Sequence, residues 1–382
     1  MTDLPDDLSA TFPILREMVF MNHAGVAPIS GPAAQALRQY ADQAESIAYV
    51  DAGWYKRAIE VKRATARLIN AEGGQEIAFV PNTSSGLSLV ANGLDWQPGD
   101  NVVITNVEYP ANRYPWENLQ RLGVEMIEVK QRPDGRIHAD DICDAITNQT
   151  RIVSISHVQY ASGHRIDLRP ISEMVHHAGG HLCVDAIQST GLLPVDVQAM
   201  GIDFLSADGH KWMLGPEGCG IFYCREELCP LLRPSVVGWM NMVDAGNYGD
   251  YRFEFQPDAR RFEPGSWNIP GIVSLGASID MLLEFGVDKV WSRVDALNTQ
   301  LCAGLAEKGY EVFSPREDPD ERSGIVIFDA PARVGGADGH RKIVHELGQQ
   351  KIVIALREGR LRVSPHFYNT AEQISRLVEA LP

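Results

Sequence analysis

The sequence lacks the motifs by which common nucleotide-binding and metal-binding folds are recognised. It contains no GxGxxG and no GxxxxGK[ST], so no motif supports a dinucleotide-binding fold or a P-loop. None of its six cysteines forms a CxxC pair, and several lie in apolar runs such as CGIFYC. We therefore expect buried, reduced thiols of a cytoplasmic protein in preference to metal ligands or disulfides.

Positive charge and long apolar runs are also scarce. Lys plus Arg number 34 against 50 for Asp plus Glu, and the net charge of −16 argues against a nucleic-acid partner. No stretch approaches the roughly 18 uninterrupted apolar residues that suggest a membrane span. The acidic start, MTDLPDDLSATFPILREM, does not have the basic and apolar regions of a signal peptide. We expect a cytoplasmic protein with neither a nucleic-acid nor a membrane partner.

What the chain does contain is an alternation of short apolar runs with helical segments. The runs are IAFV, NVVIT, VEMIEV, RIVSI, HLCVD, DFLSA and CGIFYC, all between 77 and 224. Most are separated by segments with helical apolar spacing, such as SSGLSLVANGL and LRPISEMVHHA. Strands that alternate with helices predict an α/β fold with a mostly parallel, seven-stranded sheet covered on both faces.

The length of 382 residues favours two domains. We expect the large sheet domain at 20–285. Beyond it, a helix through VWSRVDALNTQLCAGLAEKG and the strand-like runs GIVIFD, KIVIAL and RLRVS have a pattern of their own. They predict a smaller C-terminal α/β domain at 286–382, to which we assign 1–19.

Two polar residues stand where predicted strands end. Asp185 ends HLCVD, and Lys211 follows DFLSA in a turn-rich segment, SADGHKWMLGPEG. Ligands of open α/β sheets bind outside the carboxyl ends of the strands, so both side chains are expected at one rim. The segment TSSG at 83–86 opens a helix, where hydroxyls and free N–H groups make a phosphate site. Together they indicate pyridoxal phosphate, held by the lysine as a Schiff base and by the acid at its ring nitrogen.

Each residue alone has a structural explanation. A lysine in a glycine-rich turn is most often a solvated surface residue, and an aspartate after a strand is most often a cap or turn former. The hypothesis therefore depends on their combination.

With these motifs in this order, the chain resembles the class V aminotransferase family of fold-type I pyridoxal-phosphate enzymes, which includes cysteine desulfurases and isopenicillin N epimerase-like proteins. The resemblance extends from NHAG at Asn22 to SPHFYNT at Ser364, and the spacing from Asp185 to Lys211, 211 − 185 = 26, also fits. It implies a homodimer with the active site at the subunit interface.

The resemblance implies roles around the cofactor ring. Lys211 would form the Schiff base and move the Cα proton, and Asp185 would keep the pyridine nitrogen protonated. Gln188 would hydrogen-bond the phenolic oxygen. Tyr109, in EYPANRYPW, would stack on the ring, and we count it with Lys211 and Asp185 as catalytic.

Further matches concern the phosphate. Thr83 and Ser84 match the hydroxyl pair that binds it, and His210 matches the histidine beside the Schiff-base lysine. Ser266, in RFEPGSWN, matches a hydroxyl residue that reaches the phosphate of the neighbouring subunit.

Two residues are expected at the substrate. Arg362, in LRVSPHFYNT, matches the arginine that binds the substrate carboxylate through two parallel hydrogen bonds; the alternative is a surface salt bridge. His23, in MNHAG, matches a residue near the substrate pocket, although a lone histidine could equally be structural.

The chain departs from the family pattern at several positions. Desulfurases place a nucleophilic cysteine in a loop where this chain has IALREGRLRVS, and Cys302 lies in an apparent helix, so persulfide chemistry on the enzyme is not expected. Asp208 replaces a serine near the phosphate, and we expect it to turn away or to bond backbone N–H groups. Gln159 and Tyr160 are expected to line the site. The segment 237–265 is expected to be a loop over the active site or across the dimer interface.

The predicted reaction is transamination of a small amino acid. Alternatives are a β-elimination or desulfurase-like lyase without a cysteine nucleophile, and an amino-acid epimerase. All three share a carbanion at Cα and differ in where the next proton or leaving group goes. A non-catalytic cofactor-binding module is the remaining class, and such a module does not need Lys211, Asp185 and Arg362 together.

Overall fold

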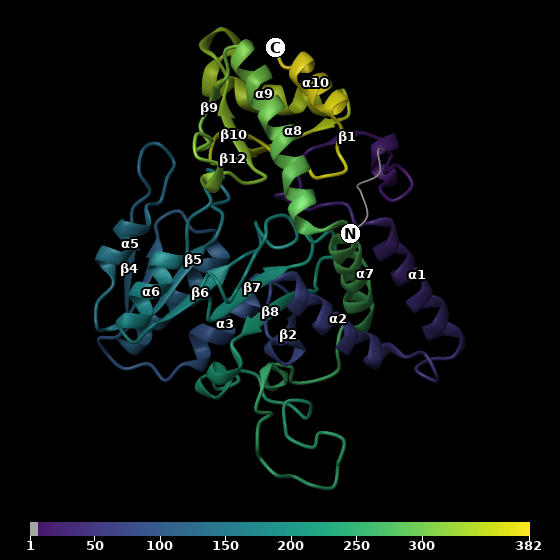
Figure 1. Ribbon diagram of the computed structural model, residues 1–382, viewed down its shortest axis with the longest axis vertical. Coiled ribbons are helices and arrows are strands. Elements are labelled where there is room, and N and C mark those ends of the chain that lie inside the picture. The colour runs from purple at the N-terminus through teal and green to yellow at the C-terminus, as the bar shows by residue number, and fades with distance from the viewer. Residues whose placement is uncertain (1–6) are drawn as a thin grey trace.

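The computed structural model of the chain describes residues 7–382, so the part of the predicted N-terminal segment at 1–6 lies outside the described residues. A large domain contains a seven-stranded sheet, and a smaller domain stands at one end of it (Figure 1). The strands of the large sheet are β2 (Ile77–Val80), β3 (Asn101–Thr105), β4 (Glu125–Val129), β5 (Thr150–Ser156), β6 (His181–Asp185), β7 (Phe204–Asp208) and β8 (Gly220–Cys224).

The sheet order is β2-β8-β7-β6-β5-β3-β4, and every neighbouring pair is parallel except the two pairs that include β8. The predicted seven strands and the mostly parallel sheet are therefore found. Because parallel strands need crossover connections, helices cover both faces. The helices of the large domain are α1 (Gly31–Ser46), α2 (Trp54–Leu68), α3 (Thr83–Gly93), α4 (Tyr114–Glu117), α5 (Ala139–Ala145), α6 (Arg169–His177) and α7 (Ile269–Phe285). Of these, α1 packs on the outer side of α7 (Figure 1).

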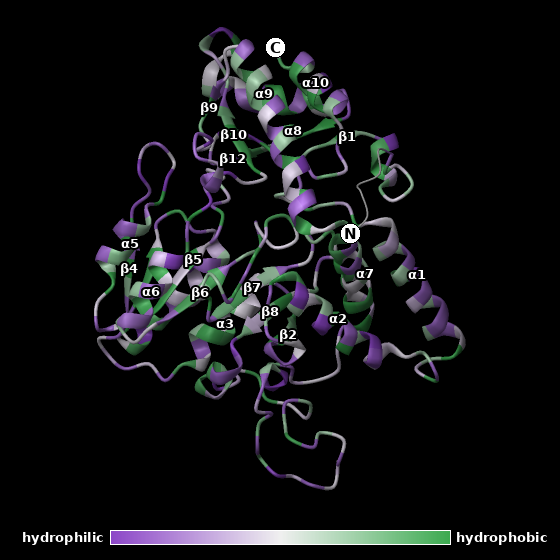
Figure 2. Cartoon of the chain, in the orientation of Figure 1, coloured by the Kyte–Doolittle hydropathy of each residue, from purple (hydrophilic) through white to green (hydrophobic). Residues whose placement is uncertain are grey.

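Alternate residues of the strands supply two separate cores. Val103 and Ile155 pack in the cluster that includes residues of α2, α6 and α7, whereas Val102 and Ile152 pack in the cluster that includes residues of α3 and α4. Figure 2 shows apolar residues along the central strands and hydrophilic residues on the outer helices. Burial on both faces explains why these strands are continuous apolar runs in the sequence.

The small domain has an antiparallel sheet of order β12-β13-β10-β9. Its elements are α8 (Val287–Glu307), β9 (Glu311–Val312), β10 (Val326–Asp329), α9 (Gly336–Gln349), β11 (Ile352–Val353), β12 (Ala355–Arg357), β13 (Arg360–Val363) and α10 (Ala371–Ala380). The predicted run KIVIAL is thus divided between two sheets. Its first part, β11, pairs in parallel with β1 (Val19–Phe20), which brings the N-terminal segment to the small domain.

A shared core joins the two domains. Phe12, Trp212, Leu282, Val290 and Phe367 belong to one buried cluster that draws on the N-terminal segment, both helices at the junction and the last loop. The helices α7 and α8 are separated by Gly286, which has a φ of 89°. The predicted boundary at 285/286 coincides with this corner, and the division into 20–285 and the rest stays a prediction.

Within 7–382, no single helix is long and apolar enough to cross a membrane; α7 and α8 reach that length and composition only as a pair, across a bend of 82°. Short 3₁₀ helices complete the structure at Pro13–Arg16, Gly74–Glu76, Pro110–Asn112, Asn118–Leu122, Glu226–Leu231, Ala259–Phe262, Pro319–Glu321 and Ala332–Val334.

Candidate active site

A cleft of about 730 Å³ opens where the carboxyl ends of the parallel strands face the small domain. Its volume is within the range of about 300–1,000 Å³ that is usual for small-molecule sites. All the predicted site residues except His23 and Ser266 line it: Thr83, Ser84, Tyr109, Asp185, Gln188, His210, Lys211 and Arg362.

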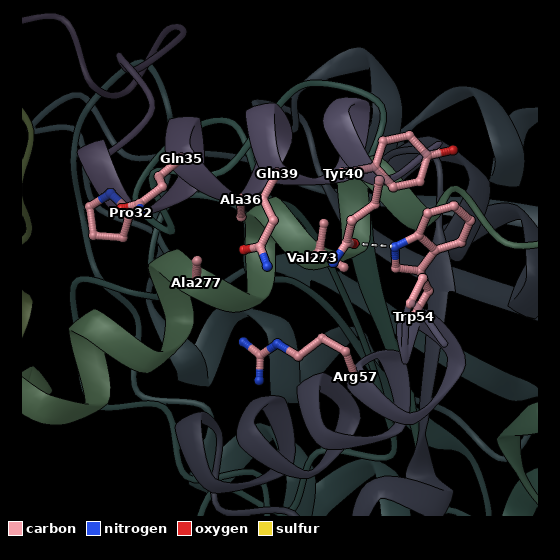
Figure 3. A pocket seen from close by; sticks show the side chains of 11 residues that line it. Pro32, Gln35, Ala36, Gln39, Tyr40, Trp54, Arg57, Val273 and Ala277 are labelled. Atoms are coloured by element: carbon pink, nitrogen blue, oxygen red, sulfur yellow. Dashed lines mark hydrogen bonds between the residues drawn. The ribbon is translucent and has the colours of Figure 1, made fainter. Parts of the chain in front are cut away.

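A second hollow of about 410 Å³ lies between α1, α2 and α7 (Figure 3). Its one charged side chain among the described residues is paired, because Arg57 donates to Asp280 at 2.6 Å, and Trp54 donates to Gln43 at 2.8 Å. It holds no unpaired charge or nucleophile, so we assign the chemistry to the larger cleft.

Lys211 is delivered to the cleft by a tight turn after β7. At Gly209 the chain passes so close to β8 that a Cβ atom would lie 2.6 Å from the carbonyl oxygen of Cys219. The Lys211 amine has no hydrogen bond or ion pair within the described residues, and it lies 5.6 Å from the centre of the Tyr109 ring. Burial lowers the pKa of Lys211, although the Asp185 carboxylate opposes that shift. Such an amine can act as a base near neutral pH.

Asp185 and Gln188 face the cleft from the end of β6. One carboxylate oxygen of Asp185 accepts the N–H of Ile187 at 3.0 Å, and burial raises the pKa of this acid. The Gln188 amide donates to the Ala24 carbonyl at 3.1 Å and accepts from the Trp212 indole at 2.9 Å. Gln188 is thereby held in one orientation, with its second N–H left for a ligand.

The start of α3 forms one wall. Asn82 caps the helix by accepting the N–H of Ser85 at 2.9 Å, and the Thr83 hydroxyl accepts the N–H of Asp208 at 3.0 Å. The helix N-terminus favours an anion at this wall. The Asp208 carboxylate faces the His210 imidazole at 3.0 Å and accepts no backbone N–H from the described residues. Of the two alternatives expected for Asp208, turning away or bonding backbone N–H groups, the second is therefore wrong.

Arg362, on β13, is only 1% exposed. Its guanidinium donates to the Tyr160 carbonyl and to the Asn22 side chain, both at 3.3 Å, and its Nε has no partner. Burial, and then repulsion from Arg357, lower its pKa. No carboxylate within 7–382 comes within 4.0 Å of it, which excludes the surface salt bridge. A buried guanidinium without an acid is costly unless an outside anion pairs with it.

Tyr109 and Tyr160 also line the cleft. Tyr109 is 49% exposed, and its ring meets that of Tyr160 edge to face at 5.2 Å. The Tyr160 hydroxyl donates to Glu358 at 3.0 Å, and burial, with help from that carboxylate, raises the pKa of Tyr160 to about 12. Tyr160 therefore keeps its proton at neutral pH.

Gln159 does not line the cleft, contrary to expectation. Its amide donates to the buried carboxylate of Glu108, which also accepts from Thr105, Asn112 and Ser156. Glu108 thereby ties together the ends of β3 and β5 behind the site. No local sequence pattern marks this acid, because its partners Ser156 and Gln159 lie 48 and 51 residues away from it.

His23 is a structural residue, and its assignment to substrate binding is wrong. It is fully buried and does not line the cleft. One ring nitrogen bonds the Ser364 carbonyl at 2.8 Å and the other bonds the Tyr368 hydroxyl. Burial holds its pKa well below the usual range. Both nitrogens are used inside the protein, so none is left for a substrate.

Ser266 is exposed and lies outside the cleft of its own chain, in a separate hollow with Glu263 and Trp267. This position leaves open its predicted service to a partner's site. The segment 237–265 also contributes nothing to the cleft, and Figure 1 shows the irregular loop before α7 projecting from the end opposite the small domain. A lid over its own active site is therefore wrong, and the interface alternative stays a prediction.

The hairpin β12–β13 takes the place of the desulfurase cysteine loop. Its connection is the two residues Glu358 and Gly359, with φ values of 46° and 80°, which is the conformation of a tight hairpin turn. None of the six cysteines lines the cleft, and burial raises the pKa of Cys302 on α8. Arg357 and Glu358 of this hairpin do line it, and the sequence analysis did not assign them a role.

Comparisons with known proteins agree along almost the whole chain. The family model described as Aminotransferase class-V matches residues 28–377. A probable cysteine desulfurase of Methanothermobacter thermautotrophicus is 32% identical over 400 residues, covering 98% of this chain and 97% of the relative. An uncharacterized aminotransferase of Bacillus subtilis, YcbU, is 27% identical over 385 residues, which cover 100% of this chain and 98% of the relative.

Two solved structures share the fold. The apo structure of a cysteine desulfurase from Thermococcus onnurineus NA1 has a TM-score of 0.88 at 23% identity, covering 99% of this chain and 97% of that chain. The complex of the cystine C–S lyase C-DES with its product cysteine persulfide has a TM-score of 0.86 at 23% identity, covering 96% and 98%.

Proposed function

The chain belongs to the aminotransferase class-V family, and on this basis we propose that it transfers the amino group of a small amino acid to a 2-oxo acid. The family, the fold-type I architecture and the cofactor, pyridoxal 5′-phosphate, are confirmed as predicted from the sequence. The choice of reaction within the family is our proposal, since its members carry the names of desulfurases and of aminotransferases.

The cleft residues fit this cofactor. The Lys211 amine is without a partner in 7–382, the start of α3 presents hydroxyls and N–H groups to an anion, and one oxygen of Asp185 is free of protein donors. We propose that these groups hold the ring and the phosphate in the roles predicted for Thr83, Ser84, Tyr109, Asp185, Gln188, His210 and Lys211.

When bound, the cofactor supplies an electron sink for the charge that develops at Cα of the substrate. Arg362 binds the α-carboxylate by two N–H donors and so fixes the direction of the Cα–H bond. Lys211, with its lowered pKa, takes the proton from Cα and holds it for return. Tyr109 and Tyr160 cover one side of the cleft and limit the access of water.

The observation that carries the proposal is the pairing, in one cleft, of a buried guanidinium without an acid and an amine without a partner. The Arg362 guanidinium needs a carboxylate, and the Lys211 amine can move a proton. Transamination of an amino acid requires both groups. Epimerisation needs a second proton donor on the other side of Cα. Tyr160 is a poor candidate because its proton is shared with Glu358, so the epimerase is a weaker alternative.

A β-elimination lyase is the second candidate function. No cysteine lines the cleft, so a desulfurase that passes sulfur to its own cysteine is not supported. A lyase that releases sulfur with its product needs no such residue, and C-DES, which shares the fold, is named as a cystine C–S lyase. A non-catalytic module has no use for the buried Arg362.

We also propose a homodimer in which Ser266 serves the partner's site. Ser266 is exposed, and exposed aromatic side chains lie on the same part of the chain, namely Trp239, Tyr248, Tyr251 and Phe253. Light scattering measures the molar mass of the purified protein in solution. We expect the mass of a dimer, and the mass of a monomer would contradict the proposal. All six cysteines are free, which supports our proposal of a reducing, cytoplasmic compartment.

The test of the reaction is a single turnover with one amino acid and no acceptor. An aminotransferase yields one equivalent of 2-oxo acid per subunit and then stops until an acceptor is added. Continued release of a 2-oxo acid with ammonia would identify the lyase, and appearance of the D-amino acid would identify the epimerase. No change with any amino acid would leave only the non-catalytic module.

A further inference from the structure

The hairpin β12–β13 presents three arginines on one face. Arg357 lies opposite Arg360, and Ala355 lies opposite Arg362, in the antiparallel register. Directly opposed residues share a face, and so do alternate residues of one strand. Arg357, Arg360 and Arg362 are therefore neighbours on the same side of the small sheet.

These arginines differ in their partners. Arg360 pairs with Asp329 at 2.9 Å and lies over the Phe313 ring at 3.6 Å, so its charge is compensated within the small domain. Arg357 donates only to the carbonyl of Leu356, at 2.9 Å, and has no carboxylate partner within the described residues. Unlike Arg360, it lines the active-site cleft.

Arg357 and Arg362 thus bring two uncompensated guanidinium groups to one cleft. The pKa of Arg362 is lowered mainly by burial and then by the positive charge of Arg357. One substrate carboxylate satisfies Arg362, which is buried deeper. The half-buried Arg357, nearer the hairpin turn, is left for a second anion.

We propose that Arg357 binds a second carboxylate of the substrate, the one at the end of the substrate's own side chain. The inference rests on the proposed function and names its substrate class: dicarboxylic amino acids and the corresponding 2-oxo acids. The antiparallel register of the hairpin makes this site, because it places Arg357 opposite Arg360 and on the same face as Arg362.

Glu358 is the one feature of the hairpin that favours a positively charged substrate side chain. Its carboxylate lines the cleft and could attract a basic side chain. It already accepts the Tyr160 hydroxyl at 3.0 Å, and it is exposed to water, which weakens its field. Arg357 has no comparable partner, so the anion is the favoured ligand.

The direct test measures binding without turnover. The cofactor-loaded protein is titrated by calorimetry with glutarate and with butyrate, which bear two carboxylates and one. We expect glutarate to bind at least about tenfold more tightly, in line with a charge-assisted pair worth about 1.4 kcal/mol. Arg357→Gln should remove this preference, and Arg357→Lys should keep part of it.

Arg360→Gln is the matched control, because it removes a neighbouring charge of the same hairpin that does not line the cleft. Equal binding of glutarate and butyrate to the wild type, or a preference that survives Arg357→Gln, would overturn the inference. So would tighter binding of lysine or ornithine than of glutamate, which would assign the site to Glu358. Circular dichroism confirms that each variant is folded.

A turnover assay separates this inference from the proposed function. Glutamate and aspartate should exceed glutamine and asparagine in kcat/KM, and Arg357→Gln should reverse the order. Transamination of neutral amino acids with no effect of Arg357→Gln would keep the function and reject the subsite. Arg357-dependent glutarate binding in a protein without aminotransferase activity would keep the subsite and reject the function.

Discussion

Lys211 and Arg362 face the same cleft from different domains, and neither has an acidic partner within 4.0 Å in the described part of the chain. Burial is the largest influence on the pKa of Lys211 and lowers it, whereas Asp185 raises it. The next largest influence is repulsion by Arg362, which lowers the pKa further. A substrate carboxylate that neutralises Arg362 removes this repulsion. The binding of substrate and the basicity of the lysine are therefore linked through the repulsion between these two positive charges.

Replacement of Lys211 by alanine should abolish the covalent attachment of the cofactor. Treatment with borohydride should add the mass of the reduced cofactor to the wild type and none to Lys211→Ala, as read by mass spectrometry of the intact chain. Amino transfer should fall at least about a thousandfold, because the base that moves the Cα proton is lost. Covalent cofactor on the variant would place the attachment at another lysine.

Replacement of Arg362 by glutamine should weaken substrate binding and spare the cofactor. We expect KM for amino acids to rise about 10- to 100-fold, from the loss of a charge-assisted bidentate pair. The thermal midpoint should be unchanged or higher, because a buried guanidinium with an unsatisfied Nε is removed. A large loss of stability with unchanged KM would make Arg362 structural.

Unfolding should become easier in mild acid, and His366 gives one reason. It is fully buried; one ring nitrogen bonds the Trp212 carbonyl at 3.1 Å, and the other accepts the Phe367 N–H at 2.8 Å. This arrangement needs the neutral ring, and burial lowers the pKa of His366 to about 4. The unfolded chain, with an ordinary pKa of about 6.5, binds the proton more readily. Its contribution to stability is thus complete above pH 6.5 and is lost as the pH falls toward 4.

Urea titrations of the cofactor-loaded protein at pH 7 and pH 5 measure this effect as a fall in the free energy of unfolding. His157 and His164, whose pKa values burial also lowers, to about 3 and about 4, add to the same trend. The His366→Gln variant serves as the comparison and should show a shallower fall. An equal fall in the free energy of unfolding between pH 7 and pH 5 for the variant and the wild type would show that His366 does not contribute.

The buried ion pair of Lys62 and Glu263 supports the segment that carries Ser266. The two charged groups lie 2.6 Å apart, both almost inaccessible to water, and Glu263 also accepts the Phe79 N–H at 2.9 Å. Lys62→Met should cost about 3–5 kcal/mol in the free energy of unfolding, because a buried carboxylate is left without its cation. The exposed lysine variant Lys342→Met is the control and should change little. Similar values for both would show that the pair is not important for stability.

The sequence predicted the large domain well because its signals are local. Buried parallel strands are apolar runs, and a polar residue at the carboxyl end of such a run, as Asp185 is, faces the rim of the sheet. The tight turn that carries Lys211 was visible in its glycines. Arg362 could be placed only by its resemblance to the family, since no local pattern distinguishes a buried arginine from an exposed one.

The errors concern contacts between distant parts of the chain. His23 is satisfied by Ser364 and Tyr368, more than 340 residues later, so a local reading could not tell a core histidine from a ligand. Gln159 is turned inward by Glu108, and Arg357 is brought beside the arginines of β13 by the pairing of β12 with β13. Such pairings depend on tertiary packing, which periodicity does not encode.

The central claim is tested most directly by following the amino nitrogen. The purified, cofactor-loaded protein is incubated with ¹⁵N-labelled glutamate and an unlabelled 2-oxo acid, and the products are analysed by mass spectrometry. We expect the label to appear in the new amino acid, and we expect Lys211→Ala to abolish the transfer. Recovery of the label as free ammonia, or no transfer with any donor amino acid, would contradict it.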